Sequence, residues 1–127
     1  MVIGFTLPLA PVAKGRPRLG KGGSVFTPVP TRVFEKQVEM LARRHKPKTP
    51  IKCGVNLHLV FTVKKPRKSV KAYPISRPDL DNYIKSVVDG LHEFWIDDAQ
   101  VIHIDAKKVY TEVNEEPSIN VLISDVL

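Results

Sequence analysis

The sequence is poor in cysteine, in long apolar runs and, over its first 77 residues, in acidic side chains. Cys53 is the single cysteine of the 127 residues, which excludes an internal disulfide and a zinc site built on cysteines. No apolar run approaches the length of a membrane helix and no leader-like segment opens the chain, so we expect a cytoplasmic protein without a membrane partner. No glycine-rich phosphate loop joins a predicted strand to a helix, which weakens the alternative of a nucleotidyl or glycosyl transferase that uses a D-x-D motif but leaves it open.

The charges divide the chain into a basic and an acidic part. Residues 1–77 carry 17 Lys and Arg against two Glu, a balance of +15, whereas residues 78–127 carry three Lys against 11 acidic residues, a balance of −8. Cations that hold phosphates by counterion release, joined to carboxylates that hold a metal, are what phosphodiester chemistry requires. A basic surface that serves only solubility is the alternative.

The acidic residues gather in the stretch 77–101, which reads RPDLDNYIKSVVDGLHEFWIDDAQV. Its apolar residues recur at helical spacing and predict a helix that begins near Pro78 and ends near Leu91. Residues two apart on a regular helix point in roughly opposite directions. Asp79 and Asp81 can therefore converge only if Asp79 lies at or before the first turn, where the backbone is not yet helical.

Asp97 and Asp98 follow this helix and precede a predicted strand. A helix start and a strand start that lie side by side would bring three carboxylates to one point, where a hard cation such as Mg²⁺ would find oxygen ligands. Only one of the two neighbouring residues can join, because neighbours in an extended segment point to opposite faces. The alternative is a helix cap and a turn with solvated charges, although crowded carboxylates repel one another without a cation.

The same 25 residues resemble the signature of the RusA family of Holliday junction resolvases, R-P-D-x-D-N-x-x-K-x-x-x-D-x-L followed by D-D-x-Q-V, and the phage and prophage type in particular. The resemblance implies essential carboxylates at Asp79, Asp81 and Asp98 and an essential lysine at Lys85. It further implies a Mg²⁺-dependent endonuclease, with Mn²⁺ as a substitute, that cuts four-way DNA junctions symmetrically as a homodimer. A less selective metal-dependent nuclease and a non-catalytic DNA-binding protein stay open as alternatives.

Two basic loops are expected to hold the DNA backbone. Residues 14–23 are rich in glycine and cations and cannot pack a core, and residues 64–71 lead directly to the acidic stretch. Plain solvated loops are the alternative. The predicted phosphate contacts are Lys14, Arg16, Arg18, Lys21, Lys64, Lys65, Arg67, Lys68, Lys71 and Arg77.

Apolar periodicity predicts a single α+β domain over residues 1–127, with a mixed sheet and two helices on one face. Strands are expected at 2–9, 24–27, 51–63, 101–113 and 118–127, the last two paired as a hairpin. A further helix is expected over 31–45, with Thr31 as its N-cap. Lys108 falls on the apolar-leaning face of its strand, so either the strand bulges or the ammonium reaches a phosphate or the carboxylates.

Overall fold

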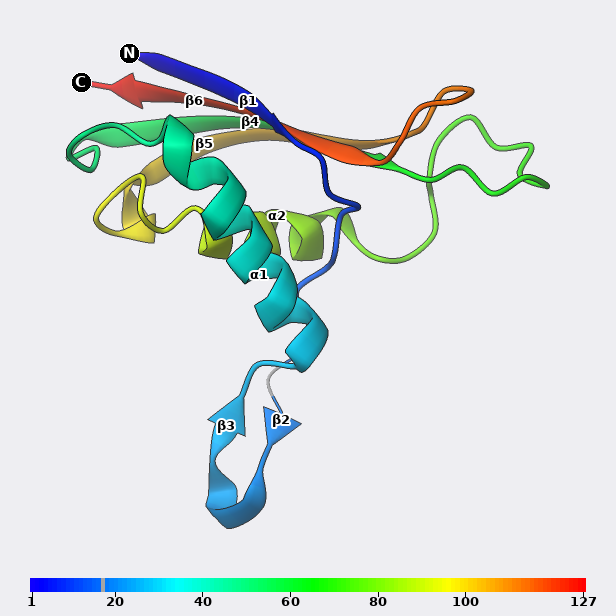
Figure 1. The fold of residues 1–127 in the computed structure, drawn as a ribbon, viewed down its shortest axis with the longest axis horizontal. Helices are drawn as coiled ribbons and strands as arrows, with labels where there is room; N and C mark the ends of the chain where they lie inside the picture. Colours follow the sequence, from blue (N-terminus) through cyan, green and yellow to red (C-terminus); the bar gives the residue numbers. More distant parts are fainter. Residues whose placement is uncertain (17) are drawn as a thin grey trace.

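The protein folds as a four-stranded mixed sheet with two helices packed on the same face, and a separate two-stranded sheet projects from the start of the first helix (Figure 1). The computed structural model describes residues 1–16 and 18–127, and the Arg18 side chain lies outside that description. The expected α+β class is confirmed. The elements are β1 (Val2–Leu7), β2 (Arg18–Leu19), η1 (Lys21–Gly23), β3 (Val25–Phe26), α1 (Val29–Ala42), η2 (Arg43–His45), β4 (Gly54–Val63), α2 (Leu80–Gly90), η3 (Asp98–Gln100), β5 (Val101–Tyr110) and β6 (Ser118–Val126).

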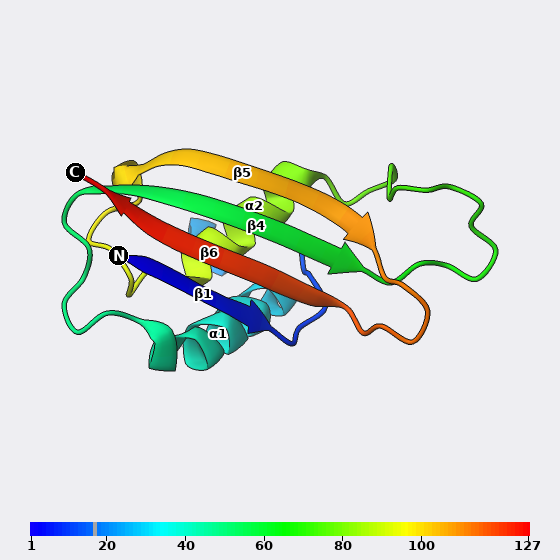
Figure 2. The ribbon, with the colours of Figure 1, turned by 90° about the horizontal axis from the view of Figure 1, so that it is seen from above.

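The strand order is β1-β6-β4-β5, with β4 and β5 parallel and the other pairs antiparallel (Figure 2). The predicted hairpin between the last two strands is therefore wrong, because β6 inserts between β1 and β4. Ile119 and Ile123 on β6 are fully buried, and a strand buried in this way is stabilised by a neighbour on each side. β5 instead becomes an edge strand, joined to β4 through the crossover helix α2.

The two helices bury apolar stripes against the sheet and against each other. Phe34, Val38 and Ala42 of α1 and Val87 of α2 are almost inaccessible to solvent. The helices approach closely at Gly90, where a Cβ on this residue would lie only 2.7 Å from Val38 Cβ, so a larger residue would push them apart. None of the described helices is long and apolar enough to cross a membrane.

The first helix begins earlier than its sequence predicted. Pro28 precedes it as the N-cap, and Thr31 is a buried residue inside it. The Thr31 hydroxyl accepts a hydrogen bond from the Gly15 backbone N–H at 2.9 Å. The expected N-cap role of Thr31 is wrong, because this side chain fastens the preceding loop rather than the helix end.

Candidate active site

Two carboxylates lie at the start of α2. Asp79 is its N-cap residue with extended backbone angles (φ −71°, ψ 147°), and Asp81 lies exposed in the first turn. The backbone condition for their convergence is thus met, since Asp79 precedes the helical backbone. Its side chain makes no capping hydrogen bond. Exposed N–H groups and the positive end of the helix dipole favour negative charge here.

Lys108 of β5 holds the loop that leads to these carboxylates. Its ammonium donates to the backbone carbonyls of Ser76 and Pro78, both at 2.9 Å. The sequence predicted that either the strand bulges or the ammonium reaches a phosphate or a carboxylate. The register of β5 against β4 does shift, at Ile102, but the Lys108 ammonium binds main-chain oxygens. It anchors the peptide immediately before Asp79 to the end of β5, and so it is a positioning residue that the sequence patterns did not reveal.

Lys85 lies one turn after Asp81 on the exposed side of α2. Its ammonium is 3.0 Å from Asp89 Oδ1, and the other oxygen of Asp89 is 2.9 Å from the Lys14 ammonium. Lys14 also pairs with Glu35 of α1. Burial disfavours the charged form of Lys14, but the hydrogen bonds to Glu35 and Asp89 outweigh it and raise its pKa above the usual range.

This network gives Lys14 a structural role. Its side chain is only 20% exposed, and its backbone N–H donates to Asn82 O at 2.8 Å. Both contacts fasten the segment before β2 to α2. The phosphate contact expected at Lys14 finds no support in this geometry, because two carboxylates already surround the ammonium.

The neighbours Asp97 and Asp98 have different surroundings. Asp97 caps η3 by accepting from the Ala99 N–H at 2.8 Å, and the Gln100 side chain completes the capping box. Gln100 also donates to the Ile51 and Cys53 carbonyls. Asp98 Oδ1 accepts from the Trp95 indole N–H at 2.8 Å. Asp97 and Asp98 each accept through Oδ1 alone from the described residues, so both retain an oxygen for a ligand. They differ in that the Asp97 hydrogen bond forms the cap of η3, whereas the Asp98 hydrogen bond comes from an indole.

Asp98 lies far from Asp79 and Asp81 within one chain. Lys108 places the helix start beside the end of β5, whereas Asp98 precedes the beginning of that strand (Figure 2). Residues 101 and 108 are about 23 Å apart at ~3.3 Å per strand residue. The expectation that a helix start and a strand start lie side by side is wrong. α2 runs in the direction opposite to β5, so the start of the helix lies beside the end of the strand.

Comparison with known proteins identifies the family of this chain. The family model described as Endodeoxyribonuclease RusA matches residues 8–124. The chain belongs to the RusA endodeoxyribonuclease family. It is similar to the uncharacterized protein YqaN of Bacillus subtilis (strain 168), with 34% identity, covering 98% of this chain and 96% of the relative. It is also similar to the crossover junction endodeoxyribonuclease rusA of Lactococcus phage r1t, with 36% identity over 56% of this chain and 58% of the relative.

Membership of the RusA family makes the protein an endodeoxyribonuclease. Enzymes of this family depend on a metal ion in general. Among the described residues, one group of three possible ligands has its atoms within 4.8 Å of one another, and it does not include the aspartates of the signature. Its members are Glu39, His92 and Glu93.

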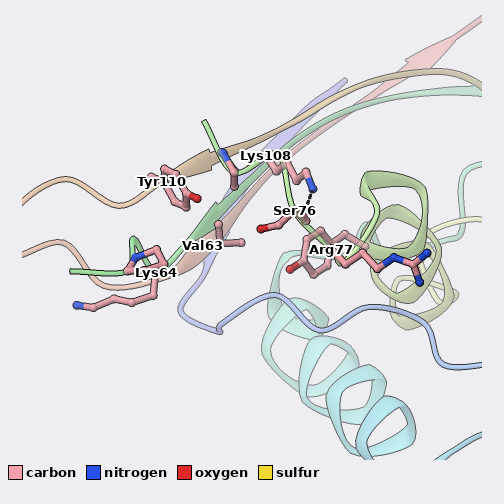
Figure 3. A pocket seen from close by; sticks show the side chains of 9 residues that line it. Val63, Lys64, Ser76, Arg77, Lys108 and Tyr110 are labelled. Carbon is pink, nitrogen blue, oxygen red and sulfur yellow. Dashed lines mark hydrogen bonds between the residues drawn. The ribbon is translucent and has the colours of Figure 1, made fainter. Parts of the chain in front are cut away.

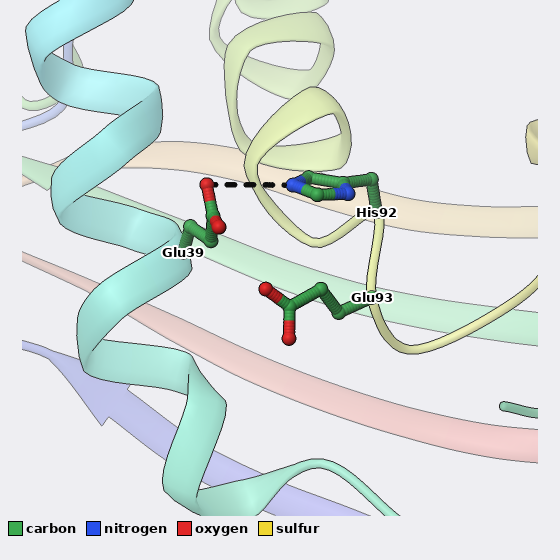
Figure 4. Close-up of side chains that lie close together, drawn as sticks. All are labelled: Glu39, His92 and Glu93. Carbon is green, nitrogen blue, oxygen red and sulfur yellow. Dashed lines mark ion pairs between the residues drawn. The ribbon is translucent and has the colours of Figure 1, made fainter. Parts of the chain in front are cut away.

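This second cluster joins the end of α1 to the turn after α2 (Figure 4). His92 Nε2 lies 3.4 Å from a Glu39 oxygen, and Arg43 binds both Glu39, at 2.8 Å, and Glu93, at 3.0 Å. Lys46 adds a contact to Glu93 at 3.1 Å. Two cations therefore already balance the two carboxylates, and the cluster is explained as an ion-pair network that ties the helices together.

Glu93→Gln should lower the free energy of unfolding by an amount that depends on pH. Hydrogen bonds from Arg43 and then Lys46 lower the pKa of Glu93 from 4.5 to about 2. Because the pKa is depressed on folding, its contribution is present above about pH 5 and is lost as the pH falls towards about 2. Urea unfolding of wild type and variant should give curves that converge at low pH.

The exposed Glu116 offers a matched control, since it forms no ion pair with any described residue. Glu116→Gln should follow the wild-type stability at every pH. A Glu93→Gln deficit that stayed constant from pH 7 to pH 3 would contradict the ion-pair explanation.

The remaining predicted DNA contacts lie on two projecting segments. The β2–β3 hairpin extends from the start of α1, and the loop after β4 extends beyond the end of the sheet (Figure 1). Described cations on these segments are exposed and form no ion pair with described residues, and the Arg18 side chain lies outside the description. The residues that stay predicted phosphate contacts are Arg16, Arg18, Lys21, Lys64, Lys65, Arg67, Lys68, Lys71 and Arg77.

Replacing Arg67 and Lys68 together with Ala should weaken binding to every DNA shape. Each lost phosphate contact should reduce the slope of log K against log salt by about 0.9. The measurement is fluorescence anisotropy of labelled junction and duplex across a salt series. Lys107→Ala removes an exposed cation from the uncovered face of the sheet and should leave the slope unchanged. Equal slopes in wild type and the double variant would exclude the loop as a phosphate contact.

Proposed function

We propose that this RusA endodeoxyribonuclease is a Holliday junction resolvase that makes paired, symmetric cuts in four-way DNA junctions during recombination and repair. The observation that carries the proposal is the placement of Asp79 and Asp81 at one helix start, with Lys85 one turn away. The named phage relative, a crossover junction endodeoxyribonuclease, supports the same substrate. A cytoplasmic location and a single functional domain over residues 1–127 belong to this proposal.

The metal site of the proposal consists of Asp79, Asp81 and Asp98. Their carboxylates fit Mg²⁺, and Mn²⁺ as a substitute, because both hard cations prefer oxygen ligands. Asp79 has no capping hydrogen bond, Asp81 is exposed, and the Trp95 indole orients Asp98 through one oxygen only. A bound Mg²⁺ would polarise the phosphoryl oxygen and activate a water for attack on phosphorus.

Two chains are needed to assemble that site. Asp98 lies before one end of β5, and Asp79 lies beside the other end. A two-fold axis near the middle of this edge strand would place Asp98 of the partner subunit next to Asp79, and the converse contact would form at the second site. Ile102 and Ile104 are exposed on β5 and offer apolar surface for such an interface. The resulting homodimer has two equivalent sites, as paired cuts in a two-fold symmetric junction require.

Lys85 supplies positive charge next to the reacting phosphate. The helix places it on the same side as Asp81, and Asp89 holds the ammonium at 3.0 Å without enclosing it. A fixed cation beside the phosphate stabilises the negative charge that develops as the phosphodiester bond breaks. Lys108 meanwhile fixes the peptide that carries Asp79.

A cleavage assay tests the proposal. A four-way junction and a linear duplex of the same sequence are incubated with the protein in Mg²⁺ and, separately, in EDTA. We expect symmetric cuts in the junction alone, in Mg²⁺ alone. Equal cutting of both DNAs would favour a less selective nuclease, and binding without cutting would favour a non-catalytic DNA-binding protein. Either result would overturn the resolvase assignment.

A further inference from the structure

A pocket of about 240 Å³ lies beside the start of α2 (Figure 3). Its walls come from the end of β4, the following loop, α2 and β5. Apolar surface is provided by Val63, Pro66 and Pro74, and ring surface by Tyr83 and Tyr110. We call this cavity the tyrosine pocket. Its volume lies below the ~300–1,000 Å³ of sites for drug-sized ligands, which points to a smaller, flat occupant.

The cations around the tyrosine pocket stand at its sides rather than inside it. Lys64 and Arg77 extend in opposite directions away from the cavity in Figure 3, and neither forms an ion pair with a described residue. The Lys108 ammonium also borders the cavity, but it is engaged by the carbonyls of Ser76 and Pro78. A phosphate inside would therefore meet walls that are polar and apolar in about equal parts, and an ammonium that is already bound.

A nucleobase fits this distribution better than a phosphate. Its flat rings would pack against the Tyr110 ring, and the Lys65 ammonium lies 5.9 Å from the centroid of that ring. The phosphates on either side of that nucleotide would meet Lys64 and Arg77. Tyr83 is 6% exposed, and its ring stacks on Phe61 at 5.5 Å between centroids, so this wall of the pocket is rigid.

The pocket also adjoins the proposed cutting site. Arg77 lies two residues before Asp79, and Lys108 contacts the carbonyl of the intervening Pro78. If a phosphate held at Asp79 and Asp81 is followed by a phosphate at Arg77, the nucleotide between them lies at the pocket mouth.

We propose that the tyrosine pocket receives one base, unstacked from the strand that is cut, next to the scissile phosphate, and that the cutting rate depends on the fit of this base. The inference deepens the proposed resolvase function and rests on it. Enzymes that draw a base out of a helix spend unstacking energy and regain it in a fitted pocket, which discriminates among bases. At a four-way junction, where strands exchange between helices, part of this stacking is already interrupted.

The test combines removal of the base with alteration of the pocket. Immobile junctions carry a single abasic nucleotide at each position around the cut, and cleavage rates in Mg²⁺ are compared for several proteins. Wild type should lose about tenfold in rate at one abasic position, the scale of one lost base–aromatic stack. Tyr110→Leu removes the stacking ring and Ser76→Trp fills the cavity from an exposed loop, and both should be insensitive to that abasic position. Tyr110→Phe keeps the ring and should therefore keep the loss of rate at that abasic position.

Tyr73→Ala is the matched control, because Tyr73 is 66% exposed on the same loop and does not line the pocket. It should keep the wild-type abasic profile. The inference is overturned if no abasic position slows the wild type. It is also overturned if the pocket variants, relative to wild type, lose the same factor in rate on the intact and on the abasic junction, which would indicate a sugar–phosphate site. A wild-type protein that cuts no junction would instead refute the proposed function itself, so the two failures are distinct.

Discussion

Asp81→Asn and Asp98→Asn proteins should each fail to cut a four-way junction, and a mixture of the two should recover cutting. Each change removes one metal-binding charge, and we expect the rate to fall by at least about 10²-fold, the scale of one lost preorganised charge-stabilising group. If Asp98 of one subunit joins Asp79 and Asp81 of its partner, a mixed dimer contains one fully native site and one site with both changes. Random mixing then restores roughly a quarter of the sites.

The product of the mixture should differ from that of wild type. A dimer with one functional site cuts one strand, so we expect nicked junctions instead of paired cuts, as resolved on a denaturing gel beside a native one. Both variants should fold normally, and their stability without metal should hold or rise, because removing one charge relieves repulsion between carboxylates.

The matched control places both changes in the same subunit. Wild type is mixed with the double variant Asp81→Asn/Asp98→Asn, so that mixed dimers have no intact site if the site is shared between subunits. Such dimers should be inactive. If each site lay within one chain, the wild-type subunit would still nick the junction, while the Asp81→Asn and Asp98→Asn mixture would stay inactive. That pair of results would contradict the shared site.

Asp97→Asn should be milder than Asp98→Asn. The Asp97 side chain caps η3 through the Ala99 N–H, and Asn can also accept that bond. An inactive Asp97→Asn protein beside an active Asp98→Asn protein would keep the chemistry and shift the ligand by one residue.

The helix at the centre of the site was predictable from its sequence. Its apolar residues keep one spacing from Leu80 to Val88, and its end at Gly90 matches the break in that spacing. The position of Asp79 before the helical backbone also followed, because Asp79 and Asp81 could not otherwise converge. Local periodicity and steric rules govern these features, and neither depends on distant parts of the chain.

The separation of Asp98 from Asp79 depended on topology that periodicity does not encode. Alternation shows which face of a strand is buried, but not which strand lies beside it. Once β4 and β5 are parallel, the crossover helix between them must run back, and its 11 residues span about 16 Å. Asp98, which follows the helix, then has to lie away from its start. The predicted hairpin between β5 and β6 did not include the parallel pairing of β4 with β5, and so the separation of Asp98 from Asp79 was not expected.

Several contacts that support the site join residues that are distant in the sequence, and no local sequence pattern indicates their partners. Lys108 bonds to main-chain carbonyls 30 and 32 residues earlier, and Lys14 joins α1 and α2 through Glu35 and Asp89. A cation on an apolar-leaning strand face was the only hint of the first contact. Neither partner could be chosen from the sequence, because any nearby carbonyl or carboxylate satisfies an ammonium.

Lys85→Ala should lower the cleavage rate by roughly 10²-fold and leave junction affinity almost unchanged. Lys85 lies one turn after Asp81 on the helix, and its ammonium is proposed to stabilise charge that develops only as the phosphodiester bond breaks, so the loss should appear in kcat rather than in KM. Single-turnover cleavage and anisotropy binding on the same junction separate these two quantities.

If Lys85 served only to stabilise the helix, its removal would change the free energy of unfolding and not the cleavage rate. Lys85 is 57% exposed and its pair with Asp89 is of the i,i+4 type, which is worth only about 0.3–0.5 kcal/mol. Lys85→Ala should therefore unfold at nearly the wild-type urea concentration. Lys85→Arg keeps the charge but not its shape, and it should regain part of the rate. The Asp89→Asn control weakens this pair, and the contact of Asp89 with Lys14 as well, while leaving the Lys85 ammonium in place. We expect it to reduce the rate less than Lys85→Ala does. If Lys85→Ala cut at the normal rate, or if Asp89→Asn were equally impaired, Lys85 would serve the helix surface and the developing charge would have to be stabilised by another group.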